Sequence, residues 1–236
     1  MSDAVDAARQ IPLPFGKFDR FDFDSYLACS NQELVQHLQK AGSGDETKNI
    51  FLWGMAGTGK SHLLQAVCSS AGCDTKNAAY IPLAQADELS PELLQGLEQM
   101  DIVCVDDLQH IAGQAPWEQA LFHLFNRLRD QQRAMIIASK YSPQVIDIDL
   151  PDLRSRLCWD LVFHLQPLDE QKRVEALQRR ARARGFTIPD EVADYLGKRA
   201  ARDTHSLFKL LDKLDEASLV AKKKLTIPFV RDLLGL

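Results

Sequence analysis

The pattern with the clearest chemical purpose is G-x-x-x-x-G-K-[ST], which the chain matches completely at residues 54–61. It lies between an apolar segment and the amphipathic segment 61–67. Glycines let backbone N–H groups wrap around phosphates, and the following helix adds its positive end. The lysine reaches the outer phosphates, and the serine hydroxyl ligates Mg²⁺. We therefore predict a nucleotide site built from Gly54, Ala56, Gly57, Thr58, Gly59, Lys60, Ser61 and His62.

A pair of carboxylates, Asp106-Asp107, ends the apolar run 102–105. Mg²⁺ prefers oxygen ligands, and Asp106 is placed to hold it through water. Asp107 stands where many ATPases have a glutamate that polarises the attacking water, and it is one methylene shorter. Acidic strand ends are common, so this pair alone is weak evidence. It becomes strong evidence because the glycine-rich run precedes it. Together the two motifs predict a nucleotide–Mg²⁺ site.

Short apolar runs that alternate with helical patterns must position these groups. We predict buried strands at 50–53, 79–81, 102–105, 135–138 and 161–163. A helix begins at Asn31, a candidate N-cap, and another carries an i, i+3, i+4, i+7 stripe between Trp117 and Leu128. Such alternation is typical of an α/β fold, here a five-stranded parallel sheet covered by helices.

The last third of the chain has a different character. After Pro167 the periodicity is helical throughout, with stripes around Leu177, Leu196 and Leu210. Residues 166–236 contain 15 Lys+Arg against 11 Asp+Glu, whereas residues 1–165 contain 13 against 22. We therefore predict an extended arm at 1–24, an α/β nucleotide-binding domain at 25–166 and a small α-helical domain at 167–236.

Composition excludes several classes of protein. With 236 residues, of which 45% are hydrophobic and 26% charged, the chain is neither disordered nor fibrous. It has no apolar run long enough to span a membrane and no basic, apolar leader at its start, so we expect a cytoplasmic protein without membrane contact. The 5 cysteines include no C-x-x-C pair, and the 6 histidines show no ligand spacing, so we expect no structural zinc.

Taken together, these motifs resemble an AAA+ ATPase of the DnaA-like branch, with a P-loop domain followed by a helical lid. Residues 23–27 resemble the segment that this family runs past the base and ribose, which implies nucleotide contacts at Tyr26 and Leu27. Residues 106–109 resemble its Walker B motif, and Pro167-Leu168 with 173–185 resembles the entry to its lid. The resemblance implies a purine nucleotide and Mg²⁺, held by Ser61 and, through water, by Asp106.

Residues 153–157, Leu-Arg-Ser-Arg-Leu, resemble the arginine-finger box of the same family. The resemblance implies that Arg156 projects into the nucleotide site of a neighbouring subunit, with Arg154 as the competing candidate. A guanidinium supplied in this way accelerates hydrolysis by about 10³–10⁵. Such fingers also imply head-to-tail contacts, and hence self-association as a further option.

The arm carries the run Gln-Ile-Pro-Leu-Pro-Phe at residues 10–15, which resembles the Q-x-x-L-P-[LF] peptide that docks on the DNA polymerase sliding clamp. A glutamine amide followed by apolar anchors on a proline-stiffened strand suits such docking. The clamp contacts implied are Gln10, Leu13, Pro14 and Phe15. Initiators of this branch continue into a helix-turn-helix domain that this sequence lacks. The resemblance therefore implies a regulator that inactivates a DnaA-type initiator.

Two positions depart from the family pattern. Ser139-Lys140 stands where an acidic sensor is usual, and His205 stands where a lid arginine touches the nucleotide, with Arg202 one turn earlier. With Asp107, these changes favour a resident diphosphate, ADP over ATP, and a regulatory role with at most weak hydrolysis of its own. The basic runs at 179–184 and 222–224 lack interleaved aromatics and indicate a solvated or partner-facing surface, without specific DNA binding. The alternatives are an autonomous AAA+ ATPase, such as a helicase loader, and a DnaA-like factor that tethers DNA.

Overall fold

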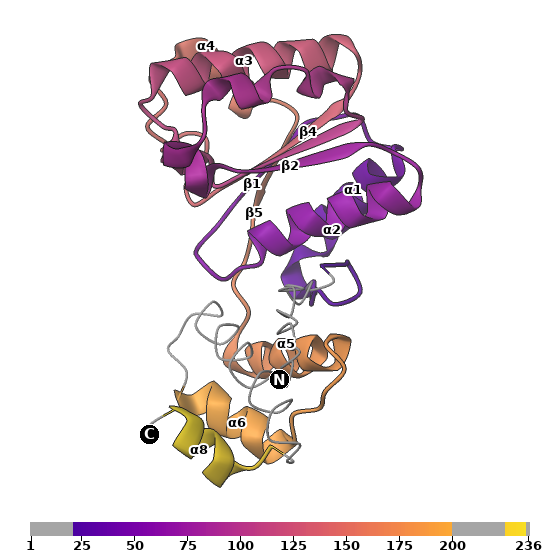
Figure 1. The fold of residues 1–236 in the computed structure, drawn as a ribbon, viewed down its shortest axis with the longest axis vertical. Coiled ribbons are helices and arrows are strands. Elements are labelled where there is room, and N and C mark those ends of the chain that lie inside the picture. Colours follow the sequence, from indigo (N-terminus) through magenta and orange to yellow (C-terminus); the bar gives the residue numbers. More distant parts are fainter. Residues whose placement is uncertain (1–20, 200–224, 235–236) are drawn as a thin grey trace, which may run out of the picture.

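The computed structural model describes residues 21–199 and 225–234 (Figure 1). All five predicted strands are present: β1 (Ile50–Trp53), β2 (Ala78–Pro82), β3 (Ile102–Asp106), β4 (Ala134–Ser139) and β5 (Leu161–His164). They form one parallel sheet in the order β2-β3-β4-β1-β5. In this order β4 lies between β1 and β3, so the carboxyl ends of all three meet at one edge. Such an edge is where open α/β sheets bind ligands.

Helices cover both faces of the sheet, as predicted (Figure 1). On one face lie α1 (Gln32–Ser43) and α2 (Lys60–Cys73), and on the other lie α3 (Ala115–Asp130) and α4 (Pro151–Leu157). Within β1, Ile50 and Leu52 belong to the α1/α2 core, whereas Phe51 between them belongs to the α3/α4 core. This alternation follows from the two-residue period of a strand, and it explains why β1 is apolar throughout.

The connections include several short 3₁₀ turns. η1 (Cys29–Asn31) precedes α1, and η5 (Leu108–His110) follows β3. Between β2 and β3 the chain forms η2 (Leu83–Glu88), η3 (Pro91–Leu94) and η4 (Leu97–Gln99) in place of a long helix. Pro91 and Gly96 interrupt this stretch, because neither residue suits a helix interior.

Two expectations from the sequence were wrong in detail. β5 is not buried on both faces: among the described residues it pairs only with β1, and Val162 and His164 are exposed. Asn31 does occupy the N-cap position of α1, but its side chain makes no capping bond. Its amide group instead donates to the Tyr26 hydroxyl and the Gln166 carbonyl, and its oxygen accepts from the Gln166 N–H. Longer-range partners therefore outcompete the local cap.

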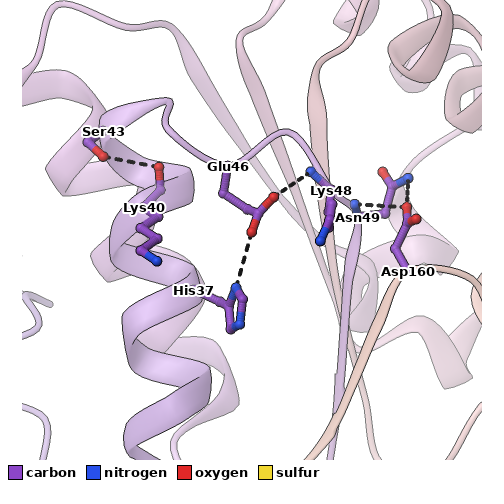
Figure 2. Close-up of polar contacts among 7 residues, drawn as sticks. All are labelled: His37, Lys40, Ser43, Glu46, Lys48, Asn49 and Asp160. Carbon is purple, nitrogen blue, oxygen red and sulfur yellow. Dashed lines mark hydrogen bonds and ion pairs between the residues drawn. The ribbon is translucent and has the colours of Figure 1, made fainter.

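The start of β1 is tied to both of its neighbours through Asn49. The Asp160 carboxylate, just before β5, accepts from the backbone N–H and the side-chain amide of Asn49 at 3.2 and 2.9 Å (Figure 2). The Asn49 oxygen accepts from the Met135 N–H in β4. The loop before it is held in turn by Glu46, whose carboxylate contacts His37 and the Lys48 N–H (Figure 2). These bonds set the register of the strand that leads into the glycine-rich run.

A separate apolar core lies beyond β5, where an extended connection leads to α5 (Glu170–Ala183), α6 (Asp190–Arg199) and α8 (Ile227–Leu234) (Figure 1). The first two helices confirm the predicted stripes, while the stripe at 207–214 lies outside the described residues. α8 was not predicted, because it is short and carries Pro228 in its first turn. Within the described residues, no helix combines the length and apolarity needed to cross a membrane.

Candidate functional site

The glycine-rich run forms the turn between β1 and α2, as the motif requires. Gly57 and Gly59 have φ of +78° and +92°, a left-handed conformation that side chains rarely adopt. The Gly54 N–H donates to the Ser139 carbonyl at 3.2 Å, which fastens the turn to β4. Gly59 directly precedes α2, so the first N–H groups of this helix face the loop. The loop therefore has the conformation of a phosphate cradle.

Lys60 lies folded into this loop and is 8% exposed. Its ammonium donates to the carbonyls of Gly54 and Met55 at 2.8 and 3.0 Å. Burial lowers the pKa of Lys60, and the nearby carboxylates of Asp107 and Asp106 oppose that shift. Phosphate oxygens are stronger acceptors for an ammonium than neutral carbonyls are, so the loop holds a cation ready for an anionic ligand.

Asp106 is almost completely buried at the end of β3. Its carboxylate accepts from the Tyr80 hydroxyl at 2.8 Å and from the Asp107 N–H at 2.9 Å, and it is hydrogen-bonded to Ser61. Burial raises the pKa of Asp106, while the bonds from Ser61 and Tyr80 work against that rise. The two predicted Mg²⁺ ligands are thus in direct contact, and their oxygens fit a divalent cation.

Asp107 is held in a strained position beside this pair. Its φ is +58°, and one carboxylate oxygen accepts from the Gln109 amide at 2.9 Å. The Gln109 oxygen in turn accepts from the Ser139 hydroxyl at 3.3 Å and from the Lys140 N–H at 2.9 Å. The carboxylate that would polarise water is therefore connected to the end of β4 through a glutamine side chain.

Tyr26 packs against residues 58 and 59 of the glycine-rich loop. Its hydroxyl donates to the Thr58 carbonyl at 3.2 Å, and burial raises the pKa of Tyr26 to about 12. A Cβ atom on Gly59 would lie 2.6 Å from a ring carbon of Tyr26, so only glycine fits there. His62 contacts the Asp22 carbonyl and the Tyr26 ring, and thereby holds the entry segment on α2. Leu27 is half-buried next to it.

Arg156 lies in α4, in the layer on the other face of the sheet from α2. Its guanidinium carbon is 3.9 Å from the centre of the Trp159 ring. Its Nη1 is buried, and among the described residues it has no hydrogen-bond partner. Arg154, the competing candidate, is exposed.

The comparisons with known proteins agree with this geometry. The bacterial DnaA ATPase domain matches residues 18–164, and the lid domain of Hda matches residues 169–234. The chain belongs to the bacterial DnaA ATPase family. It is a DnaA-like AAA+ protein related to Hda, and its five-stranded sheet and helical lid have the AAA+ fold.

Three individual proteins show the extent of this similarity. A protein of Haemophilus influenzae, described only as uncharacterized, is 39% identical and covers 97% of this chain and 99% of its own. Domain III of the Thermotoga maritima initiator DnaA superposes with a TM-score of 0.77 at 22% identity, over 91% of this chain and 95% of that domain. A DnaA bound to AMPPCP and single-stranded DNA superposes with a TM-score of 0.64 at 25% identity, over 81% and 64% of the two chains.

The structure brings several residues predicted from the sequence close together and adds two that were not predicted. The structure brings together Lys60, Ser61 and Asp106, with Tyr26 beside the loop. Tyr80 and Gln109 were missed, because their roles depend on strand order and on side-chain direction. Six predicted site residues lie outside the described parts of the chain: Gln10, Leu13, Pro14, Phe15, Arg202 and His205.

Proposed function

We propose that this chain is a negative regulator of DNA replication initiation. In this proposal it binds the sliding clamp through residues 10–15 and presents Arg156 to the ATP held by a DnaA-type initiator. The observation that supports the proposal is the set of contacts made by the Arg156 guanidinium. Its guanidinium carbon lies over an indole ring at 3.9 Å from the ring centre, and its buried Nη1 has no acceptor among the described residues. An unsatisfied buried donor costs about 1–3 kcal/mol, so contact with an acceptor is favoured.

The proposed chemistry is hydrolysis of the initiator's ATP to ADP and phosphate. Negative charge spreads over the transferred phosphoryl oxygens as the bond to the leaving group breaks. A guanidinium beside those oxygens stabilises the transition state more than the ground state, and only such differential binding accelerates the step. Arg156 needs no proton transfer for this role, because it stays charged throughout.

The chain's own nucleotide has a structural role in this proposal. We infer a resident purine nucleotide, a diphosphate in preference to a triphosphate, on the loop that contains Lys60. A Mg²⁺ ion held by Ser61 and Asp106 would neutralise phosphate charge there. The hydrogen bond from Gln109 to Asp107 supports slow ATP hydrolysis by this chain itself, because an oxygen of the carboxylate that would polarise water is already occupied by a donor. The nucleotide released on denaturing the purified protein should be a diphosphate, and an empty site would count against the inference.

Replacement of Arg156 tests the finger assignment. We expect Arg156→Ala to lower stimulated hydrolysis by the initiator by about 10³-fold or more, the lower end of a finger's contribution. Arg154→Ala is the matched control: it removes an exposed arginine from the same helix and should leave stimulation within about 2-fold, as expected for a surface substitution. The reverse result would transfer the role to Arg154.

The clamp assignment has its own test. Deletion of residues 10–15 should abolish co-elution with the sliding clamp and leave thermal stability unchanged. Co-elution at the wild-type level would contradict it.

Rapid ATP turnover by the protein alone, lost in Lys60→Ala, would instead favour an autonomous ATPase such as a helicase loader. Salt-dependent, origin-specific DNA binding would favour a DNA-tethering factor.

A further inference from the structure

Trp159 lies two residues beyond the end of α4, in an environment that is unusual for an indole. It is 40% exposed and belongs to none of the three apolar cores of the described residues. Two cations lie over its ring: the guanidinium carbon of Arg156 at 3.9 Å and that of Arg129, from the end of α3, at 4.9 Å. Two guanidinium groups thus contact the ring, and burial in one of these cores does not explain its position.

We propose that Trp159 is a positioning residue for Arg156, an inference that rests on the proposed function. The indole face attracts a guanidinium through its quadrupole, and tryptophan does so best among the aromatic residues. A flexible arginine loses much rotamer freedom when it is ordered. Trp159 orders the guanidinium before the partner binds. Less side-chain entropy is then lost when the transition state for hydrolysis forms.

Stacking on a ring leaves the finger's chemistry intact. All five N–H donors of a guanidinium lie in its own plane, so a ring against one face blocks none of them directly. Nη1 has no hydrogen-bond partner among the described residues. Arg156 is thus oriented by a cation–π contact that uses none of its N–H donors, and Nη1 has no competing acceptor among the described residues.

The backbone around Trp159 is itself fixed, as a platform requires. The Trp159 N–H donates to the Arg156 carbonyl at 3.0 Å, which places the two residues one turn apart. The next residue, Asp160, has a φ of +55°, and Asn49 donates two hydrogen bonds to its carboxylate (Figure 2). The Leu161 N–H donates to the Asn49 carbonyl. The indole therefore projects from a turn that is anchored to the first strand of the sheet.

The test separates positioning of the finger from simple binding. Single-turnover hydrolysis of initiator-bound ATP is measured against the concentration of this protein, with Trp159→Ala, Trp159→Phe and Arg156→Ala. We expect Trp159→Ala to lower the plateau rate by about 2- to 30-fold, which corresponds to one cation–π contact. The half-saturating concentration should stay within about 2-fold, and Trp159→Phe, which keeps a ring face, should recover most of the rate. Thermal unfolding of each variant provides the folding control.

Each outcome assigns the failure to one hypothesis. A loss in Arg156→Ala with a full plateau in Trp159→Ala overturns the positioning role and leaves the finger in place. An unchanged plateau with a higher half-saturating concentration makes Trp159 part of the docking contact, which also overturns the inference. Equal loss in Trp159→Ala and Trp159→Phe rules out ring stacking as the cause. A normal rate in Arg156→Ala overturns the proposed function and this inference together.

Discussion

At the scale of single residues, the site concentrates charge where water is scarce. Asp106 is 1% exposed and sits within reach of Asp107, so its ionised form is disfavoured by burial first and by like charge second. Hydrogen bonds from Ser61 and Tyr80 compensate only in part. A buried carboxylate of this kind is retained for ligand binding at the expense of stability.

Asp106→Asn should therefore stabilise the protein while it removes the proposed Mg²⁺ ligand. The pKa of Asp106 is raised above its usual 3.8, so the folded state binds more protons than the unfolded state between the two values. Its contribution to stability is complete below pH 3.8 and is lost as pH rises through the folded pKa. Urea unfolding in EDTA without nucleotide should show no difference at acid pH and a more stable variant at pH 7. A less stable variant at pH 7 would contradict the claim that burial of the charged carboxylate is the main influence on the pKa of Asp106.

Gly59 makes a sharper prediction, because two independent constraints exclude any side chain. Its φ is +92°, and a Cβ atom would collide with Tyr26. Gly59→Ala should lower the unfolding free energy by about 1–3 kcal/mol and weaken nucleotide binding. Gly72→Ala, near the end of the α2 helix that follows Gly59, is the control: no atom lies within 4 Å of its added Cβ, and it should be neutral or stabilising by up to about 1 kcal/mol. Calorimetry and nucleotide titration on both variants test this contrast.

At the scale of elements, helix α4, which contains Arg156, depends on a buried carboxylate in α3. Glu118 is fully buried and accepts hydrogen bonds from the N–H groups of Gly113, Asp149 and Leu150 at 2.8, 3.1 and 2.7 Å. Leu150 directly precedes α4, so Glu118 fixes the point at which this helix begins.

Glu118→Gln should destabilise the protein by about 1–3 kcal/mol, because an amide NH₂ would face a backbone donor. It should also reduce stimulated hydrolysis, because Glu118 holds the residues from which α4, with Arg156, begins. Glu175→Gln removes a carboxylate of similar size from an exposed ion pair with Lys172, and its effect should stay within about 0.5 kcal/mol. Denaturant unfolding of the two variants side by side tests the claim, and equal effects would refute it.

The elements also show what sequence reasoning can reach. The strands and α3 followed from local apolar periodicity, and the phosphate loop followed from a contiguous motif. The partners of Asp106 and Asp107 did not follow, because Tyr80 and Gln109 are brought to them by strand order and by a turn after β3. The exposure of β5 likewise depends on its edge position, which no local pattern records. α8 was missed because Pro228 interrupts its signal.

At the scale of the whole molecule, the entry segment connects the nucleotide loop with the lid. The Phe21 ring packs edge-on against His62 of α2, and Arg180 of α5 lies over the same ring at 5.2 Å. Asn31 links Tyr26 to Gln166, just before the connection to the lid. A change at the loop therefore has a continuous physical route to the helical domain.

Asn31→Ala should weaken this connection. It removes two donated hydrogen bonds and one accepted bond, and we expect the unfolding free energy to fall by about 1–3 kcal/mol. Nucleotide affinity should also fall, since the Tyr26 hydroxyl loses a partner beside the loop. Gln36→Ala, at an exposed position of the same helix, should change neither quantity by more than about 0.5 kcal/mol. Unchanged nucleotide affinity in Asn31→Ala would show that the hydrogen bonds of Asn31 do not affect the nucleotide loop.

The central claim is that this chain supplies an arginine to a partner's ATP. The most direct measurement loads labelled ATP into the initiator, removes free nucleotide, adds this protein with clamp on DNA, and follows phosphate release in a single turnover. The account predicts rapid release with the wild-type protein and with Lys140→Ala, and release at the initiator's basal rate with Arg156→Ala. Basal release with the wild-type protein, or rapid release with Arg156→Ala, would contradict it.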